Sequence, residues 1–168
     1  PDAGDIVAQK IVAIDIEDTA KTLYGKLCAA AGQLLDEVLP GMKEGRIPRM
    51  PQDLSRGSYF GGRKPEDGRI DWKKPAFEIY NLIRSVTDPY PGAFAFTGNG
   101  EKIIIWHGKP VILSNPEEAG NVSVHDQDVL VKTGYHAIKL LDIEIAGKRM
   151  TDAEVCQYFK TGKVRKLT

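Results

Sequence analysis

Two short runs of the sequence place a charged side chain on a glycine-containing turn, where the backbone can approach a bound ligand closely. PDAG at residues 1–4 carries the carboxylate of Asp2, and GGRK at residues 61–64 carries the guanidinium of Arg63. A carboxylate can transfer protons in acid–base catalysis, and a guanidinium can bind a phosphate through two parallel hydrogen bonds. From the local sequence alone the plainer interpretation is favoured: a solvated turn residue for Asp2 and a solubilising loop charge for Arg63.

A further polar pair lies on a predicted helix that covers residues 74–86. Asn81 and Arg84 are one helical turn apart, so both side chains can reach the same ligand. Arg84 has an alternative partner in Asp88, four residues on. In the preceding loop a similar pairing is open to Arg69, with Asp67 or Asp71. The other side of the helix carries a predicted buried stripe, formed by Ile79, Ile83 and Val86.

The formal net charge is zero, but the charges are distributed unevenly. Residues 46–74 carry eight Lys/Arg against four Asp/Glu, a net +4, whereas residues 1–45 carry four against eight, a net −4. A basic strip between acidic and neutral flanks can bind an anion. Composition alone nevertheless favours ordinary solubilising charges in an exposed loop.

Neither a metal site nor a membrane segment is predicted. No apolar run is long enough to cross a bilayer, and the first residues lack a signal pattern. Cys28 and Cys156 lie far apart inside helical patterns, which favours buried apolar side chains in a reducing compartment and hence a cytoplasmic protein. The histidines lack metal-ligand spacing: His107, His125 and His136.

The first 45 residues predict one strand and one long amphipathic helix. Residues 11–16 alternate as a strand does, and residues 19–39 repeat apolar side chains at helical spacing until Pro40 and Gly41. These two elements cannot enclose a core of their own, so the apolar face of the helix needs a partner sheet. Where that face stays exposed, association between copies of the chain is expected.

The rest of the chain predicts a linker and a small β domain. Residues 46–66 have no sustained period and are typical of a linker that runs over a surface. Short alternating runs separated by glycine turns then predict a small antiparallel barrel. A final helix from Thr151 and a loose basic tail at residues 162–166 complete the chain. The predicted strands cover residues 94–97, 102–107, 110–113, 121–124, 129–133 and 137–145.

Several separate runs resemble one enzyme family, and together they extend over the whole chain. PDAGDIVAQ at residues 1–9, SYFGGRKPEDGRIDW at 58–72, RSVTDPYPGAF at 84–94 and GKRMTDAE near the end are similar to the C-terminal part of 10-formyltetrahydrofolate-dependent formyltransferases. The runs TDPYPGAF and GGRKP look most like the branch that formylates sugar nucleotides such as UDP-4-amino-4-deoxy-L-arabinose. Methionyl-tRNA formyltransferases are relatives of that branch.

The resemblance implies a fold and a division into domains. Residues 1–45 are expected to be the C-terminal remnant of a Rossmann-like formyltransferase domain, an α/β fold. Residues 46–66 are the expected linker, and residues 67–168 the expected OB-like antiparallel β-barrel of the C-terminal domain. The sheet that receives the predicted long helix is expected upstream of Pro1, so the chain is expected to be a fragment that is inactive alone.

The resemblance also implies a chemistry for Asp2, because the family uses the Asp of an Asp-Ala-Gly turn in catalysis. Formyl transfer passes through a tetrahedral intermediate whose oxyanion needs hydrogen-bond donors, while the attacking amine must lose a proton. A carboxylate can orient a histidine and help to relay that proton. The family's Asn-x-His donors, and most of the site for the co-substrate 10-formyltetrahydrofolate, are expected upstream of this chain.

In the family the linker and the following helix face the cleft that the amine-bearing substrate enters. The resemblance therefore makes Arg63, Asn81 and Arg84 substrate-binding candidates, with Arg63 aimed at a phosphate. The expected acceptor is the amine of a UDP-amino-sugar; the first alternative is charged initiator tRNA, and the second is a non-catalytic barrel that binds nucleic acid or packs on a partner. Trp106 and Phe96 fall on alternating strand positions and are expected in the core, which disfavours nucleic acid as a general ligand.

Overall fold

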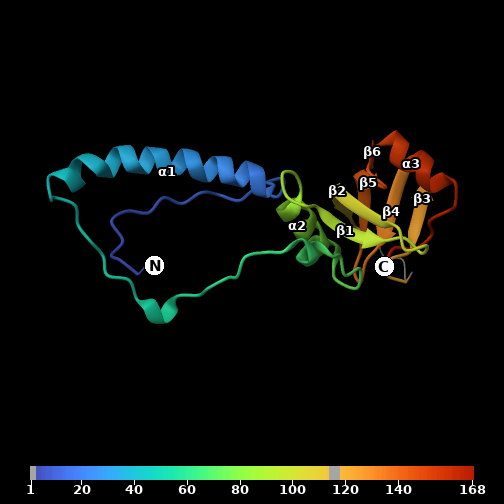
Figure 1. Cartoon of the computed structure of the whole chain (residues 1–168), viewed down its shortest axis with the longest axis horizontal. Helices are drawn as coiled ribbons and strands as arrows, with labels where there is room; N and C mark the ends of the chain where they lie inside the picture. The colour runs from blue at the N-terminus through green and yellow to red at the C-terminus, as the bar shows by residue number, and fades with distance from the viewer. Residues whose placement is uncertain (1–2, 114–117) are drawn as a thin grey trace. The chain divides into compact units, whose positions relative to one another are not determined.

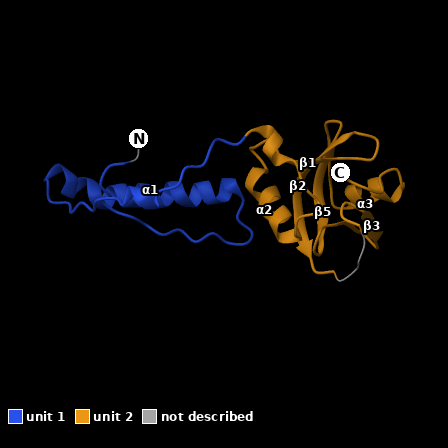
Figure 2. Ribbon diagram, turned by 90° about the horizontal axis from the view of Figure 1, so that it is seen from below, with its two compact units in different colours: residues 1–63 blue, residues 64–168 orange. Residues whose placement is uncertain are grey.

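The computed structural model describes residues 3–113 and 118–168, and the chain forms two compact units, Pro1–Arg63 and Lys64–Thr168 (Figure 2). Short 3₁₀ turns occur at Leu54–Arg56 and Pro65–Gly68. No helix of the described ranges combines the length and the apolar character that crossing a membrane requires. The helices and strands (Figure 1) are α1 (Ala20–Lys43), α2 (Ala76–Val86), β1 (Ala93–Phe96), β2 (Lys102–Val111), β3 (Val122–His125), β4 (Asp128–Lys132), β5 (Ala137–Ile145), β6 (Lys148–Thr151) and α3 (Ala153–Lys160).

The first turn of α1 is held by a dense set of hydrogen bonds. The Thr19 hydroxyl accepts from the backbone N–H of Thr22 at 3.3 Å, and the Thr22 hydroxyl accepts from the N–H of Thr19 at 2.9 Å. Asp18 adds a charged partner, because its carboxylate accepts from the Thr22 hydroxyl at 2.9 Å and from the Lys26 ammonium at 2.7 Å. The carboxylate also accepts from the N–H of Asp15 at 2.8 Å. These contacts make Thr19 the N-cap and fix the start of α1 at Ala20.

The predicted long helix is confirmed, although it continues beyond Pro40 to Lys43. A proline this close to the end removes a single intrahelical bond, and its own carbonyl still accepts from the N–H of Glu44 at 3.3 Å. None of the residues of α1 is buried. The predicted burial of Cys28 is therefore wrong. Five large apolar side chains of α1 are 43–66% exposed: Tyr24, Leu27, Leu35, Leu39 and Met42.

The strand predicted at residues 11–16 is wrong. Those residues have extended or turn backbone without ladder partners, and the side chain of Ile11 is 97% exposed. A strand needs a neighbour to bond with, and in the described part of the first unit the only such contact is a bridge between Ile6 and Met50. The alternating pattern of residues 11–16 is therefore present without the sheet that it would require.

In the second unit, six antiparallel strands form one sheet with the order β1-β2-β5-β4-β3, and β6 pairs with β5. The strands predicted at residues 94–97, 102–107, 121–124, 129–133 and 137–145 are confirmed within a residue or a few at each end. The one predicted at 110–113 is not separate, because β2 continues to Val111. β6 was not predicted and arises from a tight hairpin whose turn residues, Ala146 and Gly147, both have positive φ.

The prediction that these strands close into a barrel is wrong. β1 and β3 are edge strands of four residues each, and within the described ranges no pairing joins them. Residues from the C-terminal end occupy both edges instead. Thr168 exchanges two backbone hydrogen bonds with Phe96, at 2.8 and 2.9 Å, and the N–H of Leu167 donates to the carbonyl of Gly120 at 2.8 Å. The tail is therefore ordered rather than loose, and Leu167 is only 1% exposed.

The core of the second unit is one cluster, formed by inward side chains of the sheet together with residues of α2 and α3. The predicted stripe of α2 is confirmed, since Ile79, Ile83 and Val86 are all buried there. Val155 and Phe159 of α3 are buried in the same cluster. Figure 1 shows α2 beside β1 and β2, and α3 at the far end of the sheet. The inward side chains of the strands complete the core: Ile103, Ile105, Val129, Val131, Ile138, Leu140, Ile143 and Ile145.

The Lys26 ammonium, followed by the backbone N–H of Asp15, holds the pKa of the Asp18 carboxyl at about 2. Because this pKa lies below its unfolded value, the carboxylate stabilises the start of α1 fully above about pH 4 and loses that effect as the pH falls through about 2. We expect a carbon-13 NMR titration of Asp18 to show this midpoint. Lys26→Met should move it towards the ordinary range, whereas Lys21→Met should not. An unchanged midpoint in Lys26→Met would contradict the assignment.

Candidate functional site

Asp2 lies outside the described residues, but the residues next to it are bonded to the predicted linker at residues 46–66, the connector. The backbone of Ile6 exchanges hydrogen bonds with Met50, at 2.8 and 2.9 Å, and the Gln52 amide donates to the carbonyl of Gly4 at 2.5 Å. The first unit therefore fixes the residues that follow the PDAG turn beside residues 50–52. These bonds join the first motif to a segment more than 40 residues further along the chain.

The connector exposes a mixed aromatic and basic run. Tyr59 and Phe60 are 94% and 92% exposed, and no other aromatic side chain among the described residues is as open to solvent. Arg56 and Arg63 flank them, and both are exposed. Solvent-facing aromatic rings close to guanidinium groups can stack on a planar base while the guanidinium binds a phosphate. Sequence reasoning singled out Arg63 but missed the two rings, because only the structure shows that no core covers them.

The structure brings Asn81 and Arg84 together on α2. The Arg84 Nε–H donates to Asn81 Oδ1 at 2.9 Å, and the guanidinium lies 5.8 Å from the ring centroid of Tyr80. These contacts hold the Arg84 side chain in one orientation while Asn81 stays exposed. Arg63 belongs to the first unit and the α2 pair to the second. The three predicted binding residues therefore fall into two separate groups, one in each unit.

A cluster around Arg149 was not predicted. Its guanidinium donates to both carboxylate oxygens of Asp142, at 2.6–3.1 Å, and to Asp88 Oδ2 at 2.8 Å. It also lies 5.0 Å from the ring centroid of Trp106, whose indole N–H donates to Glu144 at 3.0 Å. The two carboxylates, Asp142 first, raise the pKa of Arg149 above its already high value. Arg149 therefore carries a permanent positive charge and contacts three parts of the second unit: β5, β2 and the loop after α2.

The Arg149 cluster depends on strand register that the sequence does not display. Arg149 of β6 lies opposite Glu144 of β5, so Asp142 is its diagonal neighbour across the hairpin. An irregularity in the β2–β5 pairing falls at Trp106, between Ile105 and His107. The GKRMTDAE run contains Arg149, and the Ala-Gly turn before it was the available signal for the hairpin.

The loop that joins α2 to β1 is anchored by this cluster. Asp88 bonds to Arg149, and the Thr87 hydroxyl donates to the carbonyl of Trp106 at 2.8 Å. Gly92 has a φ of +82°, and a Cβ there would lie 2.4 Å from a side-chain carbon of Ile104. The TDPYPG run is therefore built to pack tightly on the sheet. It places the end of α2, with Arg84, on a fixed support.

The structure gives other partners to Asp88 and Arg69 than the local pairings considered from the sequence, and it changes the placement of Trp106 and Phe96. Asp88 bonds to Arg149, and the guanidinium of Arg69 lies over the ring of Phe96 at 5.5 Å. The core assignment of Trp106 and Phe96 is wrong: both are half-buried on the face opposite Ile103 and Ile105. Alternation placed them on one face correctly, but it could not show which face meets the helices.

Within the described ranges, no group of three or more His, Cys, Asp or Glu side chains is arranged to hold a metal ion. The polar groups of the site are instead hydrogen-bond donors and fixed charges. They can bind an anionic or planar substrate and position it, while the candidate for proton transfer is Asp2.

Residues 63–159, more than half of the chain, match the family described as formyl transferase, C-terminal domain. Among solved structures, a variant of HypX from Aquifex aeolicus has a TM-score of 0.68 at 19% identity, over 96% of this chain and 30% of that chain. HypX in complex with tetrahydrofolic acid has a TM-score of 0.62 at 18% identity, over 96% and 28%. An N-formyltransferase from Helicobacter canadensis, in complex with folinic acid and dTDP-3-aminofucose, has 0.59 at 21% identity, over 83% and 50%.

A methionyl-tRNA formyltransferase from Clostridium thermocellum has a TM-score of 0.50 at 21% identity, over 86% of this chain and 50% of that chain. These identities support a shared fold. The chain spans less than a third of the HypX chain and half of each of the other two.

We predict that Arg149→Met lowers the free energy of unfolding of the second unit by about 1–2 kcal/mol, because it leaves two carboxylates without their charged donor at a half-exposed position. Thermal denaturation followed by tryptophan fluorescence measures the change. Lys148→Met, at the exposed neighbouring position, is the control and should have little effect. Equal effects of the two substitutions would show that the cluster does not stabilise the fold.

Proposed function

The chain belongs to the formyl transferase family through its C-terminal domain, and from this premise we propose that it is part of an enzyme that formylates the amine of a sugar nucleotide. The proposed formyl donor is 10-formyltetrahydrofolate, and the proposed acceptor class is the UDP-amino-sugars, with UDP-4-amino-4-deoxy-L-arabinose as its representative. A folate co-substrate is supported by the fold neighbours, two of which are complexes with tetrahydrofolic acid and folinic acid.

The observation that carries the sugar-nucleotide acceptor is the composition of the connector surface. Tyr59 and Phe60 offer two open ring faces, and Arg63 offers a guanidinium three residues on. A nucleotide sugar presents one base and one pyrophosphate, which match an aromatic ring and a guanidinium. The H. canadensis neighbour, solved with dTDP-3-aminofucose, is a fold relative that binds such a ligand.

The proposed chemistry is an acyl transfer. The acceptor nitrogen attacks the formyl carbon, the bond from that carbon to the folate nitrogen breaks, and the proton lost by the amine is returned to the folate nitrogen. Asp2 is proposed to hold and pass this proton, through a histidine of the family's Asn-x-His motif. Arg63, Asn81 and Arg84 are proposed to bind the acceptor, with the Asn81–Arg84 hydrogen bond fixing the geometry of the second pair.

The proposed domain division follows from the same premise. Residues 1–45 are proposed to be the end of a Rossmann-like catalytic domain, residues 46–66 its linker, and residues 67–168 the C-terminal domain. The open apolar side chains of α1, from Tyr24 to Met42, support a sheet as the partner of that helix.

A methionyl-tRNA acceptor is the second candidate, because cations lie over aromatic rings on the outer face of β1 and β2. Arg69 lies over Phe96, and the Lys102 ammonium lies 4.2 Å from the ring centroid of Phe94. In both pairs a cation already covers the ring face, and Phe94 is buried. We therefore rank the tRNA acceptor below the sugar nucleotide, whose candidate ring faces are open.

The acceptor is tested by offering the full-length enzyme 10-formyltetrahydrofolate with a UDP-amino-sugar or with charged initiator tRNA. Formylation of the sugar nucleotide is the expected outcome, with weak dependence on salt because a single pyrophosphate is bound. Turnover of the tRNA alone, with the steep salt dependence of many phosphate contacts, would reverse the ranking.

Substitutions in the full-length enzyme separate binding from chemistry. Arg63→Ala and Tyr59→Ala should each raise KM for the nucleotide sugar about tenfold with kcat little changed, because each removes a contact with the bound acceptor. Asp2→Asn should lower kcat about 100-fold or more with KM little changed. Arg46→Ala, an exposed basic residue of the same connector, is the control. A large kcat effect of Arg63→Ala would remove it from the binding role.

A further inference from the structure

A pocket in the second unit arises because two segments share the outer edge of β1. The N–H of Ile70 donates to the carbonyl of Phe94 at 2.8 Å, and two residues further along the same edge Phe96 bonds to Thr168. Since Thr168 occupies that position, residues 69–73 cannot continue beside the strand and must separate from it. The space between residues 69–73 and residues 166–168 is a pocket of about 470 Å³.

The walls of this pocket are fixed by backbone bonds. Beyond Ile70, the carbonyl of Trp72 accepts from the N–H of Gly134 at 2.8 Å, where a side chain on Gly134 would collide with the Lys73 carbonyl. On the other side, Leu167 is bonded to Gly120. A pocket of this volume between fixed walls is of the size that binds small organic molecules.

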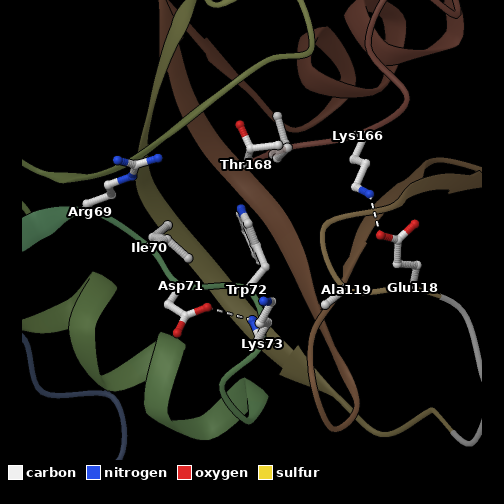
Figure 3. Close-up of a pocket in the computed structure, with 10 residues that line it drawn as sticks. Arg69, Ile70, Asp71, Trp72, Lys73, Glu118, Ala119, Lys166 and Thr168 are labelled. Carbon is white, nitrogen blue, oxygen red and sulfur yellow. Dashed lines mark hydrogen bonds and ion pairs between the residues drawn. The ribbon is translucent and has the colours of Figure 1, made fainter.

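The lining combines an apolar floor with a rim of charges (Figure 3). Ile70, Trp72 and Leu167 are buried core residues, and Ala119 packs against them. They present carbon surface to the interior of the pocket. The flat indole of Trp72 is the largest of these surfaces, which favours a planar or branched apolar body in the ligand.

The indole nitrogen of Trp72 is a donor without a partner. Trp72 is only 4% exposed, and among the described residues nothing accepts a hydrogen bond from its Nε1–H. In Figure 3 the nitrogen-bearing edge of the ring points across the pocket towards Thr168. Leaving a buried donor unsatisfied costs about 1–3 kcal/mol. An acceptor atom delivered by a ligand would remove that cost.

The charges around the pocket leave an excess of positive groups. The Lys166 ammonium pairs with Glu118 at 2.5 Å and lowers the pKa of that carboxyl, and Asp71 accepts from the backbone N–H of Lys73 at 3.0 Å. In the described chain no carboxylate forms an ion pair with the side chain of Lys73 or of Arg69. Both are exposed at the rim, where they can meet an anion.

We propose that this pocket binds a small carboxylate with a planar or branched apolar body. The body lies on Trp72 and Ile70, and Lys73 and Arg69 neutralise the charge. One carboxylate oxygen accepts from the Trp72 indole N–H once the side chain of Thr168 turns aside, while the backbone bonds of Thr168 to Phe96 are kept. The site is built entirely from the second unit and lies outside the residues proposed for formyl transfer. It does not depend on the proposed acceptor.

The two tryptophans of the chain provide a direct test with an internal reference. In nitrogen-15 NMR spectra of the 168-residue chain, the indole N–H of Trp106 is bonded to Glu144 and serves as the reference, assigned through Trp106→Phe. The probes are 1-naphthoate, its neutral analogue 1-naphthalenemethanol, and inorganic phosphate. We expect saturable movement of the Trp72 signal with 1-naphthoate only, with the neutral analogue binding at least tenfold more weakly.

Each alternative result overturns the proposal in a specific way. Equal affinity for the neutral analogue would show that the pocket does not recognise the carboxylate. Equal affinity for phosphate would show that it does not recognise the apolar body. Movement of both indole signals would indicate non-specific binding. A stationary Trp72 signal with every probe shows that no such site exists.

Substitutions locate the binding at the pocket. Lys73→Gln and Arg69→Gln should each raise the Kd for 1-naphthoate about three- to tenfold, because each removes a rim cation. Ala119→Leu fills the pocket and should abolish binding, whereas Ala153→Leu, at an exposed position of α3, should leave it unchanged. If Ala119→Leu fails to fold, the two exposed rim variants still decide, and an unchanged Kd in both overturns the proposal.

Discussion

Backbone hydrogen bonds from the last few residues to both edges of the sheet are the constraint on which the second unit depends. The edge strands β1 and β3 lie at opposite ends of the strand order and do not pair within the described ranges, so each would otherwise present unpaired N–H and C=O groups. Residues 165–168 satisfy groups on β1 and at the start of β3 together. Burial of Val164 and Leu167 holds this tail in register. The open sheet thereby gains the protection of its edges that closure into a barrel gives.

The two units differ in how far their apolar side chains are buried. In the second unit, α2 and α3 share one core cluster with the inward side chains of the sheet, and an ionic cluster at Arg149 links the hairpin to the loop after α2. In the first unit, α1 has well-formed caps but no buried residue. Its stability as a helix therefore rests on local hydrogen bonds, and its apolar face is available to a partner.

Periodicity predicted the elements well where a local rule decides them. The helical spacing of residues 19–39 predicted α1, and the stripe of Ile79 and Ile83 predicted the buried face of α2. Periodicity failed where the structure of a segment depends on which residues are adjacent to it in space. Residues 11–16 alternate like a strand but pair with no strand of the described chain, and nothing in the spacing of the tail shows that Leu167 fits between two sheet edges.

The candidate site shows the same limit. Asn81 and Arg84 were predictable as a pair because residues three apart on a helix lie on the same side of it, and the hydrogen bond between them confirms the proximity. Arg149 was not, because its partner Asp142 becomes a neighbour only through the β5–β6 register. The open rings of Tyr59 and Phe60 could not be recognised either, since exposure is a property of the folded surroundings.

The pairing of the tail with both sheet edges also has a consequence for biosynthesis. A ribosome releases the chain from its N-terminus onward, so α1 and α2 can form while the later strands are still being made. The edges at Phe96 and Gly120 must wait for Leu167 and Thr168 to leave the exit tunnel. Until then the nascent second unit carries two uncovered edges and an incomplete core, the state in which chaperones are most needed. Rapid translation of the segment from Gly120 to Thr168 would shorten that interval.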